Sequence, residues 1–124
     1  MKDRIKILVV DDTPNLQFAA SRLLEGAGYE VSCASSGAEC LAALADGRPD
    51  AIVLDVMMPG MDGPTTLDAI RDNPATYDVP VVFLTAGVVD SDMDRLRALP
   101  VAGILNKPFD PLQLSRQLGD ILGW

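Results

Sequence analysis

The sequence contains no histidine, and this absence removes several classes of function at once. Without histidine the chain offers no His-ligated zinc site, no Ser-His-Asp triad and no phosphohistidine of its own. Cysteine occurs only at Cys33 and Cys40, without the spacing of a metal site. We therefore predict two free thiols in a reducing compartment, which makes the cytoplasm the expected location.

Basic residues and long apolar runs are also scarce. Ten Lys and Arg stand against 18 Asp and Glu, which gives a formal net charge of −8. Nucleic-acid binding needs a basic face, so we expect no direct DNA binding. No apolar run approaches the roughly 18–20 residues that cross a bilayer, and no signal peptide is predicted, so we expect no membrane association. The acidic excess is compatible with a carboxylate site for a cation.

What is present is the composition of a globular protein, with 48% hydrophobic and 23% charged residues. The length fits one domain, 1–124, without repeats or linkers. Apolar, β-branched segments alternate with segments of helical periodicity. Strands are predicted at 5–10, 30–34, 51–54, 79–84 and 103–106, and helices at about 14–26, 36–45, 64–71, 91–99 and 111–122. The continuous apolar strands predict an α/β fold with a parallel sheet covered on both faces, and Phe18, Phe83 and Phe109 are expected in its core.

Polar residues stand where four of the five predicted strands end. These are Asp11 with Asp12, then Asp55, Thr85 and Lys107. Because the carboxyl ends of parallel strands share one edge of a sheet, these side chains are expected to converge. Clustered carboxylates repel one another unless a cation joins them, and Mg²⁺ prefers oxygen ligands. A carboxylate can also attack phosphorus to form an acyl phosphate, so the pattern predicts Mg²⁺-dependent phosphoryl chemistry.

The chain resembles, over its whole length, the receiver domains of two-component response regulators, including the chemotaxis regulators. The matching motifs are Asp11-Asp12, the segment LDVMMPGMDG at 54–63, Thr85-Ala86 and Lys107-Pro108-Phe109. Each motif alone is weak, but all four in order are specific. The resemblance implies a flavodoxin-like (βα)5 fold, doubly wound around a parallel five-stranded sheet of strand order 2-1-3-4-5.

The resemblance implies a phosphorylation site with a bound Mg²⁺. Asp55 would accept the phosphoryl group and also ligate the metal. Asp12 would ligate it directly, Asp11 directly or through water, and Met57 through its backbone carbonyl.

The resemblance also implies a switch. Thr85 would bond a phosphoryl oxygen and move on activation, and Lys107 would pair with the phosphoryl group, or with Asp55 before it arrives. The Lys107–Pro108 bond resembles one that is cis in the family. Ile104 departs from the family's usual Tyr or Phe, so the common aromatic switch is not expected. Pro100 also departs from a common Gly, and the standard dimerisation mode is not carried over.

The implied function is a phosphorylation-dependent signalling switch of a phosphorelay. A sensor histidine kinase or a His phosphotransfer protein would donate the phosphoryl group, and a downstream protein would bind the reorganised surface. The domain would assist its own phosphorylation and dephosphorylation but would not be an enzyme. Whether it stands alone or belongs to a larger protein, and its oligomeric state, are left open.

Three alternatives remain at this stage. Asp11-Asp12 could serve only to cap a helix. A phosphohydrolase of the haloacid-dehalogenase type would need a second Asp two residues after its nucleophile, where this chain has Met57. A receiver that binds partners without phosphorylation is favoured only by Ile104 and opposed by the intact acidic motifs.

Overall fold

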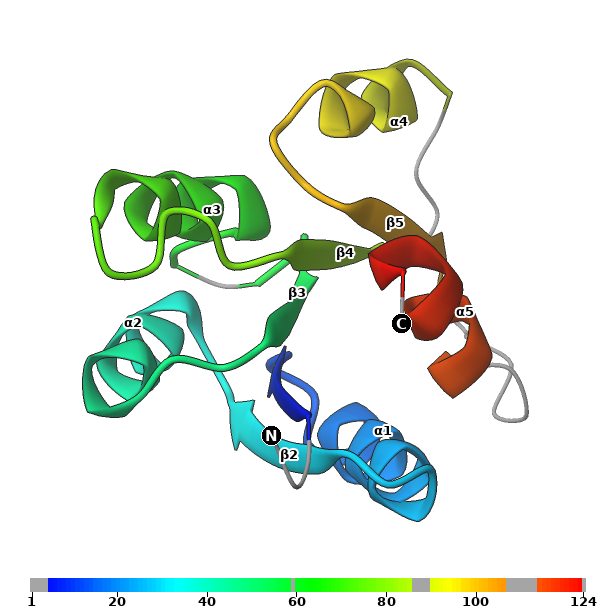
Figure 1. Cartoon of the computed structure of the whole chain (residues 1–124). Helices are drawn as coiled ribbons and strands as arrows, with labels where there is room; N and C mark the ends of the chain where they lie inside the picture. The colour runs from blue at the N-terminus through cyan, green and yellow to red at the C-terminus, as the bar shows by residue number, and fades with distance from the viewer. Residues whose placement is uncertain (1–4, 59, 86–89, 107–113, 124) are drawn as a thin grey trace.

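The structure is a computed structural model, and it describes residues 5–58, 60–85, 90–106 and 114–123. Strands and helices alternate along these residues (Figure 1). The strands are β1 (Lys6–Val10), β2 (Glu30–Ala34), β3 (Ala51–Asp55), β4 (Val81–Thr85) and β5 (Gly103–Asn106). The helices are α1 (Pro14–Gly26), α2 (Gly37–Asp46), α3 (Gly63–Asp72), α4 (Asp90–Arg97) and α5 (Leu114–Leu122). Among the described residues, no helix has the length and apolar character needed to cross a bilayer.

The five strands form one parallel sheet in the order β2-β1-β3-β4-β5, which confirms the predicted fold. Each strand is followed by a helix that returns the chain to the start of the next, as parallel pairing requires. Helices α1 and α5 cover one face of the sheet, and α2, α3 and α4 cover the other (Figure 1).

Strand β1 shows why the strands are apolar at consecutive positions. Successive side chains point to opposite faces of a sheet. Ile7 and Val9 pack with α1 and α5, whereas Leu8 and Val10 pack with α2, α3 and α4, and all four are buried. Since both faces are covered, a polar residue at any of these positions would lose its contact with water.

Several boundaries differ from the predicted ones by one or two residues, and those of β4 and α4 are examples. Strand β4 begins at Val81, not at Val79, and it includes Thr85. Pro80 has no N–H to donate to a ladder, so the regular pairing starts after it, although its carbonyl accepts from the Ile52 N–H at 2.9 Å. Helix α4 spans Asp90–Arg97 in place of 91–99.

The prediction that Phe18 lies in the core is wrong, whereas the same prediction for Phe83 is confirmed. Phe18 is 65% exposed and its ring lies 5.6 Å from the Arg22 guanidinium carbon, a cation–π contact. The buried face of α1 carries Ala20 and Leu24, and Phe18 points away from it. Phe109 lies outside the described residues.

Both cysteines are free thiols, as predicted. Cys33 is exposed on β2, with its Sγ 2.9 Å from Ser21 Oγ on α1. Cys40 is buried in α2, and burial raises the pKa of its thiol to about 11 because the charged thiolate would be desolvated. Cys40 is therefore a neutral packing residue at physiological pH.

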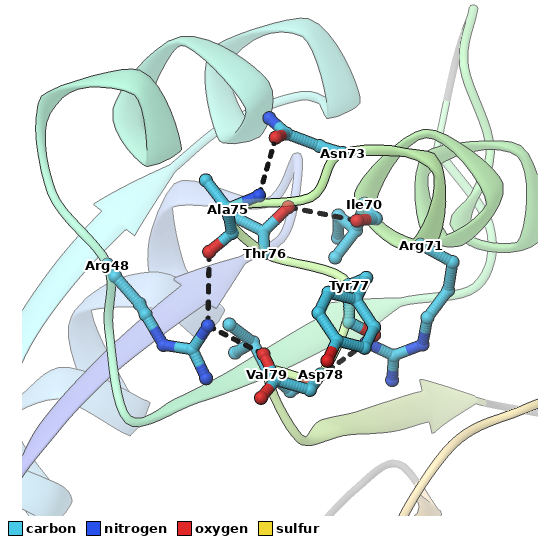
Figure 2. A network of polar contacts seen from close by, with 9 residues as sticks. All are labelled: Arg48, Ile70, Arg71, Asn73, Ala75, Thr76, Tyr77, Asp78 and Val79. Atoms are coloured by element: carbon cyan, nitrogen blue, oxygen red, sulfur yellow. Dashed lines mark hydrogen bonds and ion pairs between the residues drawn. The ribbon is translucent and has the colours of Figure 1, made fainter.

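Arg48 and Arg71 contact the connection that leads into β4 (Figure 2), and Arg71 also contacts the connection that leads into β5. Arg48 donates to the Ala75 carbonyl at 3.0 Å and to Asp78 Oδ1 at 2.6 Å, and this hydrogen bond lowers the pKa of Asp78. Arg71, in the last turn of α3, donates to the carbonyls of Tyr77 at 2.9 Å and Val79 at 2.7 Å. The same guanidinium reaches the Pro100 carbonyl ahead of β5, at 2.8 and 3.2 Å. One side chain thus fixes three carbonyls at the amino ends of two strands.

Replacing Arg71 by Ala should destabilise the domain, because the carbonyls of Tyr77, Val79 and Pro100 would lose their donor together. We expect a loss of about 1–3 kcal/mol in the free energy of unfolding, measured by urea denaturation. Arg97→Ala is a matched control, since Arg97 also stands in the last turn of a helix. Its side chain is exposed and makes a long ion pair of 3.8 Å with Asp94. Equal losses in the two variants would show that the carbonyl contacts add nothing beyond a last-turn charge.

Candidate functional site

Asp11 directly follows strand β1 and is held there by backbone contacts. Its N–H donates to the Ala34 carbonyl at 3.1 Å, which continues the pairing of β1 with β2. Its Oδ1 accepts from the Thr13 N–H at 2.8 Å, and Thr13 stands at the N-cap position of α1 without a capping hydrogen bond from its side chain. Asp11 is fully buried and Asp12 is exposed. Neither aspartate therefore stands at the N-cap position of α1.

Asp55 is the last residue of β3 and is only 3% exposed. Its Oδ1 accepts from the Met57 N–H at 3.3 Å. Helix α3 begins close behind it, because a Cβ on Gly63 would come within 2.7 Å of the Asp55 carbonyl oxygen. Asp62 caps this helix by accepting from the Thr65 N–H at 2.8 Å. A glycine at position 63 therefore lets the start of α3 pack directly against the end of β3.

The three aspartates meet at one edge of the sheet. Because β1 and β3 are neighbours, their carboxyl ends bring Asp11, Asp12 and Asp55 together, with one carboxylate oxygen of each within 4.8 Å of the others. Three carboxylates this close, two of them buried, repel one another unless a cation is present. The donor set is all oxygen, with neither histidine nor cysteine in the group, and hard oxygen ligands fit Mg²⁺.

Thr85 ends β4, beside the strand that carries Asp55. It is 1% exposed, and its Oγ1 has no hydrogen-bond partner among the residues that the structure describes. A buried hydroxyl without a partner costs free energy, so such a group needs a reason. An oxygen atom arriving at the neighbouring Asp55 would supply an acceptor.

The remaining predicted site residues are placed only in part. Lys107 and the Lys107–Pro108 bond lie outside the described residues. Met57 is 72% exposed and its N–H faces Asp55, while the role of its carbonyl stays a prediction. Ile104 is half-buried on β5 and packs against the core between the sheet and helices α2, α3 and α4.

Gln17 is absent from the predicted site residues, although its side chain reaches the same rim. Its Nε2 donates to the Asp11 carbonyl, and it lies 2.9 Å from Ser35 Oγ and 3.3 Å from the Ala34 carbonyl. A signal was present in the sequence. Gln17, Ala20 and Leu24 follow the i, i+3, i+7 spacing of one helix face, and the last two are buried, so Gln17 is a polar residue on an apolar stripe.

Known proteins are similar to this chain in sequence and in fold. The family model of the response regulator receiver domain matches residues 7–118. The response regulator PleD of Caulobacter vibrioides is 44% identical over 115 residues, which cover 88% of this chain and 24% of PleD. Protein PilG of Pseudomonas aeruginosa is 34% identical over 112 residues, which cover 90% of this chain and 83% of PilG. The solved structure of the chemotaxis protein CheY4 of Vibrio cholerae has a TM-score of 0.88 and 34% identity, and covers 95% of this chain and 98% of CheY4.

Sequence and fold therefore agree. The family match extends from β1 into α5, and the strand order is the one that the resemblance implied. The chain spans about a quarter of PleD, so the similarity concerns one domain of that protein. The chain belongs to the response regulator receiver domain family of two-component signalling.

Proposed function

We propose that this domain is a phosphorylation switch in which Asp55 accepts the phosphoryl group. The observation that carries the proposal is the meeting of Asp11, Asp12 and Asp55, with carboxylate oxygens within 4.8 Å of one another. A carboxylate oxygen of Asp55 attacks the phosphorus of a phosphohistidine. The new P–O bond forms as the P–N bond to the donor imidazole breaks, which leaves an acyl phosphate on Asp55.

The cation of the site is proposed to be Mg²⁺. Asp12 and Asp55 would ligate it, with Asp11 bound directly or through water and Met57 through its carbonyl. Bound Mg²⁺ would offset the repulsion among the carboxylates and the charge of the phosphoryl oxygens. Asp11 is oriented for such a role by its own hydrogen bond from the Thr13 N–H.

The switch would begin at Thr85. Its buried hydroxyl, which has no partner within the described part of the chain, supports a role as donor to a phosphoryl oxygen, with Lys107 as the pairing cation. Movement of Thr85 would reorganise the surface that a downstream protein binds. Ile104 is already packed inward and lacks an aromatic ring, so the output would differ from the family's aromatic switch.

The phosphodonor is proposed to be a sensor histidine kinase or a His phosphotransfer protein, with residues 1–124 acting as one receiver domain. The free thiols support a reducing compartment, and we place the domain in the cytoplasm. A switch is favoured over a phosphohydrolase because Met57 stands where the hydrolase has its general acid. A thioether cannot donate a proton to a leaving group.

Mg²⁺ should raise the thermal midpoint of the wild-type domain, since it binds carboxylates that only the folded state brings together. At a Mg²⁺ concentration of about 100 Kd the gain is about 2.7 kcal/mol, or several degrees in Tm by calorimetry. Asp12→Asn should melt higher than wild type without metal, because repulsion is relieved, and should lose most of the Mg²⁺ increment. Asp68→Asn, at an exposed position on α3, should keep the full increment. If the Tm of the wild-type domain is the same with and without Mg²⁺, the proposed metal site is wrong.

Incubation with a small phosphodonor and Mg²⁺ should add one phosphoryl group to the wild-type protein, detected by intact mass. Asp55→Asn should take up none, because an amide is not a nucleophile towards phosphorus, while its circular dichroism stays that of the wild type. Asp62→Asn is the matched control from the same loop and should be phosphorylated normally. Stoichiometric phosphorylation of Asp55→Asn would show that another residue is the acceptor.

A further inference from the structure

Gln17 connects three parts of the chain that meet beside the acidic site. It stands on α1, and its Nε2 donates to the carbonyl of Asp11 after β1. The same nitrogen lies 3.3 Å from the carbonyl of Ala34 at the end of β2 and 2.9 Å from Ser35 Oγ in the following loop. A single amide group therefore joins α1, β1 and β2 at the carboxyl edge of the sheet.

The orientation of this amide is fixed by chemistry. Two of its three neighbours are backbone carbonyls, which accept hydrogen bonds but cannot donate them, so the NH₂ group and not the oxygen must face them. The Ala34 carbonyl also accepts from the Asp11 N–H at 3.1 Å, so Asp11 and Gln17 share an acceptor. The two hydrogens of the amide are thus distributed over three acceptors.

The contact with the Asp11 carbonyl acts on Asp12. A peptide unit is planar, so the oxygen of residue 11 and the N–H and Cα of residue 12 move as one rigid group. Asp11 itself is held at its N–H by Ala34 and at its Oδ1 by the Thr13 N–H at 2.8 Å. The bond from Gln17 therefore fixes the plane from which the Asp12 side chain starts. Asp12 is exposed, so burial does not fix the orientation of its side chain.

We propose that Gln17 is a positioning residue of the metal site, which keeps the Asp12 carboxylate within reach of Asp55 by fixing the Asp11–Asp12 peptide. The inference rests on the proposed function, because it takes Mg²⁺ as the cation of the acidic cluster. Gln17 does not touch the metal or the reacting atoms in this role. Without its amide the carbonyl of Asp11 would lose this donor, the Asp11–Asp12 peptide would be less constrained, and more of the Mg²⁺ site would have to be ordered on binding.

A purely structural role would be to attach α1 to β2, and Ser21 distinguishes the two roles. Ser21 lies one helical turn after Gln17, and its Oγ is 2.9 Å from Cys33 Sγ on β2. It thus makes the same kind of contact between α1 and β2, and its partner is Cys33 and not the acidic segment. Ser21→Ala is the matched control.

The test is a Mg²⁺ titration of the folded, metal-free domain followed by two-dimensional ¹H–¹⁵N NMR. The amides of Thr13 and Met57 report the site directly, because each donates to a carboxylate of the cluster. Gln17→Met keeps the length of the side chain and removes the donor, and it should raise the Kd for Mg²⁺ about tenfold. Gln17→Asn keeps the amide but withdraws it by one methylene, and should weaken binding in the same direction. Ser21→Ala should keep the wild-type Kd.

The outcomes separate the two proposals. Wild-type protein that shows no Mg²⁺-dependent shift at Thr13 or Met57 overturns the proposed metal site. Wild-type protein that binds Mg²⁺, with an unchanged Kd in both Gln17 variants, overturns the positioning role alone. Equal weakening by Ser21→Ala and Gln17→Met also overturns it, since the effect would then come from the attachment of α1 to β2. The two variants are folded if their dispersed amide spectra match that of the wild type away from residue 17.

Discussion

Three carboxylates that repel one another lie at the carboxyl edge of the sheet, and the fold must hold them together. Asp11, Asp12 and Asp55 bring an oxygen each within 4.8 Å of one another, and two of the three side chains are buried. Such a cluster is unfavourable in a metal-free protein, and it forms only because the sheet places the ends of β1 and β3 side by side. The apolar cores on both faces of the sheet supply the stability that holds these charges together. The same repulsion makes the site ready for a divalent cation and an incoming phosphoryl group.

The two ends of the sheet have different tasks. At the amino ends, Arg48 and Arg71 fasten the connections into β3, β4 and β5 to one another, so that these strands begin at fixed places. At the carboxyl ends lie the acidic cluster and the Thr85 hydroxyl, which has no partner among the described residues. Both raise the free energy of the folded state when no ligand is bound. The contacts at the amino ends therefore help to stabilise a fold that carries unfavourable groups at its carboxyl ends. Phosphorylation would act at the carboxyl ends, where it would move Thr85.

Much of this architecture could be predicted from the sequence, because its signals are local or follow from topology. Continuous apolar runs predicted parallel strands, and the polar residues at the ends of four predicted strands predicted the edge at which Asp55 and its partners meet. Three features of the structure were not predicted, or were predicted wrongly. Phe18 is apolar but lies off the buried stripe of α1, and β4 starts later than expected because Pro80 cannot pair. Gln17 acts through a backbone carbonyl and so belongs to no side-chain motif, and its only signal was its place on the apolar stripe of α1.

The central claim is that Asp55, the acidic pair and Thr85 act as one site around a phosphoryl group. The most direct measurement is a crystal structure with Mg²⁺ and beryllofluoride, which stands in for the phosphoryl group of the acyl phosphate. In this complex we expect beryllium to be joined to a carboxylate oxygen of Asp55 and a metal ion to lie among the three aspartates. We also expect Thr85 Oγ1 to donate a hydrogen bond to a fluorine atom. Beryllofluoride bound elsewhere, or a metal ion that does not contact the aspartates, would contradict the claim.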